Sequence, residues 1–158
     1  MLAQISFEQA SLGLQAALLL QVLWAMALGA LVGWERERYD KPAGLRTHML
    51  VAAAGALIAG ISSELVLEAG FGDPTRGIHA IVTGIGFLGA GAILRPRKGP
   101  VGGLTTAATV FFTACLGVAV ASGFGLAATV ATVAAVLVLQ YAGRLLPVHP
   151  PRLPDPEH

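Results

Sequence analysis

Five long apolar stretches, separated by short segments rich in charge, glycine and proline, divide this chain. Each stretch is about as long as a helix that crosses the roughly 30 Å hydrocarbon core of a bilayer. No Lys or Arg precedes the first stretch, so we expect an anchor rather than a cleavable signal peptide. We predict an all-α integral membrane protein with five transmembrane helices, at about residues 12–34, 47–67, 77–94, 104–121 and 124–141.

The positive charges favour one orientation of these helices. With the N-terminus outside, Arg76 is the only basic residue in an outer connection. The other nine of the ten basic residues lie in inner segments: Arg36, Arg38, Lys41, Arg46, Arg95, Arg97, Lys98, Arg144 and Arg152. Basic residues concentrate in cytoplasmic loops, so we predict that the N-terminus is outside and the C-terminus inside.

Composition supports the membrane class and adds little else. The 158 residues are 55% hydrophobic and 12% charged, with a mean hydropathy of +0.72. We expect one transmembrane domain over residues 1–146 and a proline-rich cytoplasmic tail over 147–158. The net charge of +1 does not indicate a nucleic-acid partner. Neither a phosphate-binding loop, nor an HExxH motif, nor a nucleophile elbow is found, so we expect no enzyme and no cofactor.

Two sequence patterns recur about 60 residues apart. Leu28-Gly29-Ala30 returns as Leu88-Gly89-Ala90, and the Pro-Gly-Leu-Thr pattern of residues 42–47 returns in residues 100–105. Helices one and two therefore resemble a copy of helices three and four. Both hairpins start outside, so the repeat is parallel, with an axis along the membrane normal. The alternative is chance similarity between glycine-rich apolar segments.

Small residues mark the faces expected to pack. They are Gly29 and Gly33 in the first helix, and Gly84, Gly86, Gly89 and Gly91 in the third. Such residues let transmembrane helices approach closely. We predict that the third helix is the central, enclosed one. Alternatives for these stripes are the seam of a homodimer, or a pore lining.

Threonines and carboxylates supply the remaining polar candidates. The fourth helix carries Thr105, Thr106, Thr109 and Thr113, of which 105, 109 and 113 share one face that could face Thr83 and a cytoplasmic vestibule. The alternative is that each threonine bonds a carbonyl of its own helix, as is common in lipid. Glu68 and Asp73 at the outer rim could loosely hold hydrated Mg²⁺, which needs only one or two carboxylates. Interfacial solvation is the alternative. The middles of the five stretches contain no Asp, Glu, Lys or Arg, which disfavours a simple ion pump.

Several ordered motifs resemble those of the MgtC/SapB family of bacterial inner-membrane proteins. They are residues 33–37 (GWERE), 41–51 (KPAGLRTHMLV), 73–76 (DPTR), 84–91 (GIGFLGAG) and 103–108 (GLTTAA). The resemblance covers roughly residues 15–142 and implies a five-helix protein of the bacterial inner membrane. It also implies a link to growth in low magnesium and, in pathogens, to survival inside host cells.

The resemblance leaves two functions open. One is magnesium transport, and the other is regulation of a partner membrane protein such as ATP synthase. The chain departs from the family in having Gly102 where an Arg usually precedes the Gly-Leu-Thr-Thr run. Many relatives also carry a soluble C-terminal domain, whereas we expect the short form here.

Charged and polar residues inside the family-like motifs are our candidates for function. They are Glu35, Arg46, Asp73, Arg76, Thr83, Thr105 and Thr106. Arg46 and Glu35 flank one inner loop and can reach each other or the start of the fourth helix. An ion pair there could hold the two inner loops together. Asp73 precedes the third helix, where a carboxylate also serves as a cap. Besides membrane lipid, we expect a homodimer partner or another membrane protein.

Overall fold

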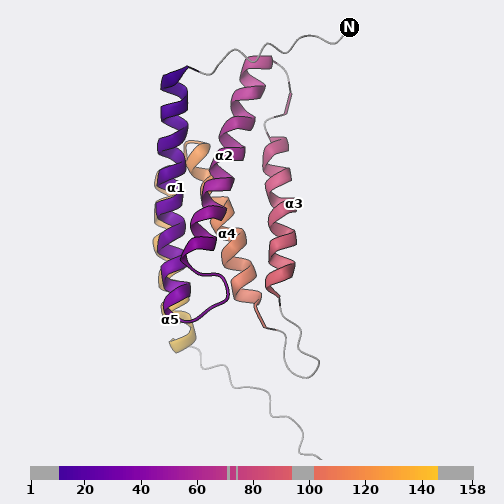
Figure 1. The fold of residues 1–158 in the computed structure, drawn as a ribbon. Coiled ribbons are helices and arrows are strands. Elements are labelled where there is room, and N and C mark those ends of the chain that lie inside the picture. The colour runs from indigo at the N-terminus through magenta and orange to yellow at the C-terminus, as the bar shows by residue number, and fades with distance from the viewer. Residues whose placement is uncertain (1–10, 71, 74, 94–101, 146–158) are drawn as a thin grey trace, which may run out of the picture.

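The computed structural model describes residues 11–70, 72–73, 75–93 and 102–145, without the side chains of 68, 69 and 142–145. The expected all-α class is confirmed in this part of the chain. The five helices are α1 (Leu12–Arg38), α2 (Leu45–Ala69), α3 (Thr75–Ala92), α4 (Leu104–Ala121) and α5 (Gly125–Leu145). They run side by side and alternate in direction (Figure 1). The predicted tail lies outside the described residues.

The largest difference in helix bounds is at the end of α1. This helix continues past the apolar stretch through the charged run Glu35–Arg38. Nearby, α2 begins at Leu45, with Gly44 as its N-cap. Glycine offers no side chain to that cap, and the carboxylate of Glu37 accepts a hydrogen bond of 2.7 Å from the Leu45 N–H instead. The charged end of α1 is therefore helical, and its Glu37 side chain bonds directly to the start of α2.

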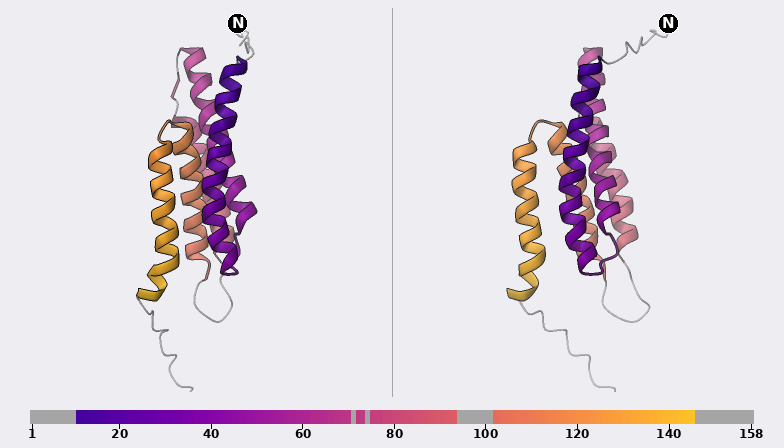
Figure 2. Two further views of the ribbon diagram at one scale, coloured as in Figure 1. Left: turned by 90° about the vertical axis from the view of Figure 1, so that its left-hand side faces the viewer. Right: turned by 60° about the vertical axis from the view of Figure 1, so that its left-hand side comes forward.

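The centre of the bundle is α4, which contacts all four other helices. The prediction that the third helix is central is wrong, because α3 contacts only α2 and α4. A narrow stripe of α3 is buried, at Ile81, Ile85 and Gly89. Figure 2 shows α5 at the other flank, where it contacts α1 and α4.

Glycine brings α1, α2 and α4 into backbone contact. A Cβ atom added to Gly29 of α1 would lie 2.5 Å from the His48 carbonyl oxygen of α2. At Gly33 it would lie 2.7 Å from the Cα of Leu45. On the other side of α2, a Cβ at Gly117 of α4 would overlap the carbonyl oxygen of Ala52. We call this region the glycine seam: Gly29, Gly33, Gly55 and Gly117.

Four of the five glycines of α3 behave differently, whereas a Cβ at Gly77 would lie 2.6 Å from the Ser62 side chain of α2. A Cβ at Gly84, Gly86 or Gly91 would have no other atom within 4 Å, and at Gly89 it would meet only the Ala107 side chain, at 3.8 Å. Within this chain these positions have open space. A packing role for Gly84, Gly86 and Gly91 therefore stays a prediction about contacts outside the chain.

The outward surface is apolar, as expected for helices in lipid. Exposed side chains include Leu20, Leu23, Phe87, Leu126 and Val138. In the described chain, three helices are long and apolar enough to span a membrane: α1, α2 over Leu45–Leu67, and α4. The apolar part of α5, Gly125–Tyr141, is shorter. The helices are those of a multi-pass membrane protein. The number of spans, the orientation and the repeat stay predictions.

We predict opposite effects for alanine at Gly117 and at Gly84. Both lie inside helices, where Gly→Ala alone gains about 1 kcal/mol in helix propensity. Gly84→Ala should keep that gain, because its site is open. Gly117→Ala should lose about 1–3 kcal/mol, because the methyl group overlaps the α2 backbone. Thermal unfolding in detergent measures the difference, and equal melting temperatures would contradict the seam.

Candidate functional site

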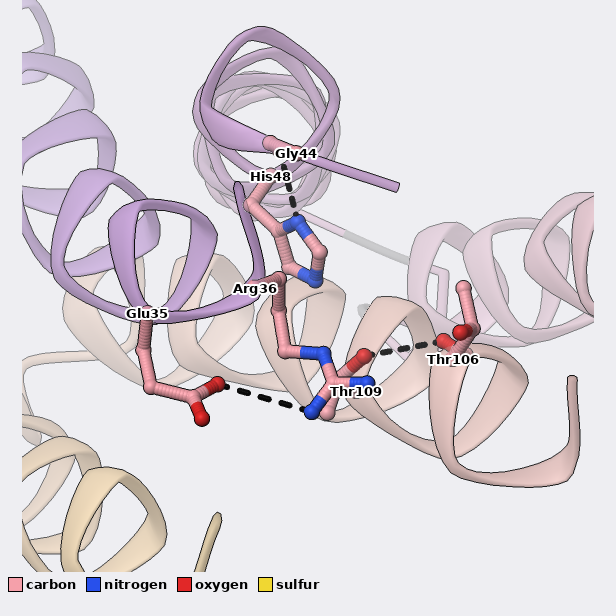
Figure 3. A network of polar contacts seen from close by, with 6 residues as sticks. All are labelled: Glu35, Arg36, Gly44, His48, Thr106 and Thr109. Atoms are coloured by element: carbon pink, nitrogen blue, oxygen red, sulfur yellow. Dashed lines mark hydrogen bonds and ion pairs between the residues drawn. The ribbon is translucent and has the colours of Figure 1, made fainter. Parts of the chain in front are cut away.

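A cluster of buried polar side chains lies at one end of the bundle, where α1 ends and α2 and α4 begin. We call this end the Arg36 end, and the cluster the Arg36 cluster: Glu35, Arg36, His48, Thr106 and Thr109 (Figure 3). All five residues are buried in a protein whose outer surface is largely apolar. Buried polar and charged groups are costly, so such a concentration indicates a functional site.

Glu35 and Arg36 form the ion pair of the cluster. Arg36 Nη1 donates to Glu35 Oε2 at 3.5 Å, and the two residues are only 5% and 3% exposed. Successive residues on a helix do not face each other, so both side chains must turn to meet and the contact is long. The Nε of Arg36 is buried without an acceptor among the described residues. The pair therefore leaves Arg36 with unused hydrogen-bonding capacity.

His48 is fully buried between α1 and α2. Its Nδ1 lies 2.9 Å from the Gly44 carbonyl oxygen, which can only accept, so Nδ1 carries the proton. Its Nε2 is buried and has no partner in the described part of the chain. A Cβ at Gly33 would lie 3.1 Å from the Cβ of His48. The imidazole therefore has room only because α1 has glycine at this level.

The first turns of α4 supply the threonines of the cluster. Thr109 donates its hydroxyl proton to the Thr106 carbonyl at 2.9 Å, and Thr113 donates to the Thr109 carbonyl at 2.8 Å. These two hydroxyls are thus satisfied within their own helix. The side chain of Thr106 has no hydrogen bond within the described residues. Of the threonines in this helix, Thr106 is buried with its hydroxyl free to bind.

A cavity of about 500 Å³ opens beside the cluster. Residues from the α1–α2 connection and from the start of α4 line it: Arg36, Asp40, Lys41, Pro42, Gly103, Leu104, Thr105 and Thr106. The structure therefore brings together Thr105 and Thr106, which the sequence singles out, with Arg36, which neighbours Glu35. It combines charged side chains with the first turn of a helix.

Arg46 does not join this cluster. It is exposed at the start of α2, and Glu35 pairs with Arg36 rather than with Arg46. The expected ion pair between Arg46 and Glu35 is therefore wrong. Arg46 lies in the turn after the glycine cap, where its side chain points to the surface of the bundle. A function for Arg46 stays a prediction.

The remaining candidates lie away from the Arg36 end. Asp73 follows α2 at the opposite end, where its Oδ1 accepts from the hydroxyl of Thr75 at 2.7 Å and from the Thr75 N–H at 2.9 Å. These hydrogen bonds hold the pKa of Asp73 below its ordinary value. Asp73 thus initiates α3, as a cap does. Arg76 and Thr83 are exposed, and the Thr83 hydroxyl bonds the His79 carbonyl of its own helix at 2.9 Å.

The predicted magnesium site at Glu68 and Asp73 falls partly outside the described side chains. The side chain of Glu68 lies outside the described part, and Asp73 is exposed. Among described residues, no group of three or more His, Cys, Asp or Glu is placed to hold a metal ion. Magnesium binding at this end stays a prediction.

The sequence analysis did not select Arg36 or His48, although a signal for both was present. Gly29, Gly33 and Arg36 recur at helical spacing, so Arg36 continues the small-residue face of α1. His48 likewise begins a face that continues as Ala52, Ala56 and Ala59 of α2. Polar residues at the end of a packing face are buried by the same contact that buries the small ones.

These features define a multi-pass helical membrane protein with a buried polar site at one end. The MgtC family matches residues 22–146, and the chain belongs to this family. The match includes the whole Arg36 cluster. No solved structure shows significant similarity to the chain.

Among curated relatives, Protein MgtC of Brucella abortus is 46% identical over 109 residues, which are 69% of this chain and 44% of that protein. The protein named "Putative magnesium transporter YhiD" of Escherichia coli K12 is 40% identical over 124 residues, 75% of this chain and 57% of that protein. Protein SrpB of Synechococcus elongatus is 37% identical over 138 residues, 79% of this chain and 74% of that protein. The chain spans about half the length of several of its relatives.

We predict that Glu35 and Arg36 depend on each other for burial. Arg36→Met should cost about 3–5 kcal/mol, because it leaves the Glu35 carboxylate buried and unpaired. The double variant Glu35→Leu/Arg36→Met should unfold at a higher temperature than Arg36→Met alone, since no buried charge remains. Arg38→Met, at an exposed position in the same turn, should change stability by less than about 0.5 kcal/mol.

Thermal unfolding of the wild type and these three variants in one detergent measures how far the stability effects of Glu35 and Arg36 depend on each other. If the double variant is no more stable than Arg36→Met, the two side chains contribute separately and the pair is not a unit.

Proposed function

We propose that this protein serves growth at low magnesium as a regulator in the bacterial inner membrane, acting on a partner membrane protein. Membership in the MgtC family and the name of the relative YhiD support the link to magnesium. The glycine seam supports regulation over conduction. It brings α1 into backbone contact with α2, and α2 into backbone contact with α4. The polar cavity is lined by Arg36, the α1–α2 connection and the first turn of α4, and the neighbouring cavity along α1, α4 and α5 is lined mainly by apolar side chains.

Burial of charge at one end suits a regulator. Placing Glu35, Arg36 and His48 between helices costs free energy, which is returned when a ligand or partner satisfies their free polar atoms. Binding at the cavity would then favour one arrangement of the α1–α2 connection over another. A change in the α1–α2 connection would alter the surface of the protein that a partner contacts.

Magnesium transport is the second candidate. It is favoured by the name of the relative YhiD, which matches 75% of this chain. The acidic residues Glu68 and Asp73 would then be the place where hydrated Mg²⁺ gathers. Transport would require a path outside the glycine seam, for example between copies of the chain that pack through the open glycines of α3.

The two candidates predict different results in the same pair of assays. The protein should restore growth of a low-magnesium-sensitive strain, and Glu35→Gln at normal protein level should reduce that growth. Liposomes that contain only this protein should take up Mg²⁺ no faster than empty liposomes. Uptake above the empty control, abolished by substitutions at Asp73, would instead establish transport. Arg38→Gln serves as the exposed control in both assays.

We further propose five membrane spans with the Arg36 end in the cytoplasm. The alternating helices and the nine basic residues in alternate connections support this arrangement. The single cysteine, Cys115, is exposed on α4 and has to be replaced by Ala before labelling. In that background, an impermeant thiol reagent applied to intact spheroplasts should label Thr75→Cys but not Pro42→Cys. The reverse pattern would contradict the orientation.

A further inference from the structure

The start of α4 forms one wall of the 500 Å³ cavity at the Arg36 end. Four consecutive residues, Gly103 to Thr106, line it. The first hydrogen bond between turns runs from the Ala107 N–H to the Gly103 carbonyl, and none of the described side chains caps the preceding amides. The first amides of a helix need acceptors from elsewhere. This wall therefore presents unsatisfied donors and the positive end of a helix dipole.

Arg36 forms the opposite wall and points to the same kind of ligand. It lines the cavity although only 5% of its surface is exposed. Among the residues described, the only acceptor of its guanidinium is Glu35, which meets Nη1 at 3.5 Å. A guanidinium has five N–H donors in a fork that matches phosphate and carboxylate oxygens. The buried Arg36 therefore has several donors left for a ligand with more than one oxygen.

The other charged groups around the cavity determine whether it favours an anionic or a cationic ligand. Lys41 adds a positive charge and Asp40 a negative one, so these two exposed neighbours offset each other. Glu35 offsets part of the charge of Arg36 from behind. The helix dipole then leaves the cavity positive. The hydroxyls of Thr105 and Thr106 add donors without charge.

We propose that this cavity binds a phosphate group, which is carried either by an anionic phospholipid headgroup or by free phosphate in solution. The amides that open α4, the Arg36 guanidinium, Lys41 and the hydroxyl of Thr105 donate to its oxygens. Helix N-termini bind phosphate by this combination of free amides and dipole. This phosphate site coincides with the site of the proposed function. Phosphate can bind there whether or not the protein takes part in magnesium adaptation.

The test uses the full-length protein, purified and delipidated in a maltoside detergent that contains no phosphate. In one arm, inorganic phosphate is titrated against chloride at matched ionic strength, and the melting temperature is followed. In the other arm, the protein is given phosphatidylglycerol or a phosphate-free glucosyl diacylglycerol in mixed micelles. A rise with inorganic phosphate identifies a soluble ligand. A rise with phosphatidylglycerol alone identifies a lipid headgroup, and no rise in either arm overturns the proposal.

Variants show whether binding occurs in this cavity. Lys41→Gln and Thr105→Val change exposed side chains, so the protein should fold, and each should weaken binding by about three- to tenfold. Asp40→Asn removes the one opposing carboxylate at the mouth and should tighten binding several-fold. Arg38→Gln lies in the same turn of α1 as Arg36 but does not line the cavity, so it should bind like the wild type.

Two results would contradict the assignment. One is an equal response of Lys41→Gln, Thr105→Val and wild type, which would place the phosphate elsewhere. The other is stabilisation by Mg²⁺ that Asp40→Asn abolishes, which would make the cavity a cation site. Because binding is measured on purified protein, a negative growth result leaves this test unaffected.

Discussion

Close contact between the backbones of α1, α2 and α4 is the constraint on which the rest of this structure depends. Lipid gives no hydrophobic drive for helices to associate, so their contact relies on packing and on small residues. Gly29, Gly33 and Gly117 remove the side chains that would hold the helices apart. This contact makes α4 central, leaves α3 and α5 on the flanks, and sets the space in which His48 and Arg36 lie.

The same contact explains why charge is tolerated at the Arg36 end. At this level α1 and α2 meet through glycine, and the Glu37 carboxylate caps α2 from the end of α1. Glu35 and Arg36 are thereby drawn between helices instead of remaining in a solvated loop. A buried ion pair rarely adds much net stability, because desolvation offsets the attraction. Its position beside a polar cavity is therefore better explained by ligand binding than by folding.

The two ends of the bundle differ in physical character. At the Arg36 end, charged groups are buried, incompletely paired and next to a cavity. At the opposite end, Asp73 is exposed and its oxygen is already occupied by Thr75. The first arrangement leaves polar atoms of Arg36 and His48 without a partner in the described chain, while the second mainly starts a helix. This contrast is why the proposed function places its site at the Arg36 end.

The sequence by itself determined the class of the protein and most of its elements. Long apolar stretches must be helical in lipid, because backbone groups there can only be satisfied internally. It also marked Thr105 and Thr106, which line the cavity at the Arg36 end, and Glu35, which pairs with Arg36 beside it. Its motifs pointed to the family, which the match over residues 22–146 confirms.

The tertiary structure decided which helix faces meet, and this could not be read from composition. Glycines are abundant in both α3 and α1, yet Gly29 and Gly33 of α1 face the backbone of α2 while Gly84, Gly86 and Gly91 of α3 do not face another helix, because contact depends on the partner that lies opposite. Arg36 and His48 were overlooked because a polar residue at the end of a span resembles an interfacial one. Only the approach of α2 and α4 to α1 shows that these two side chains are enclosed.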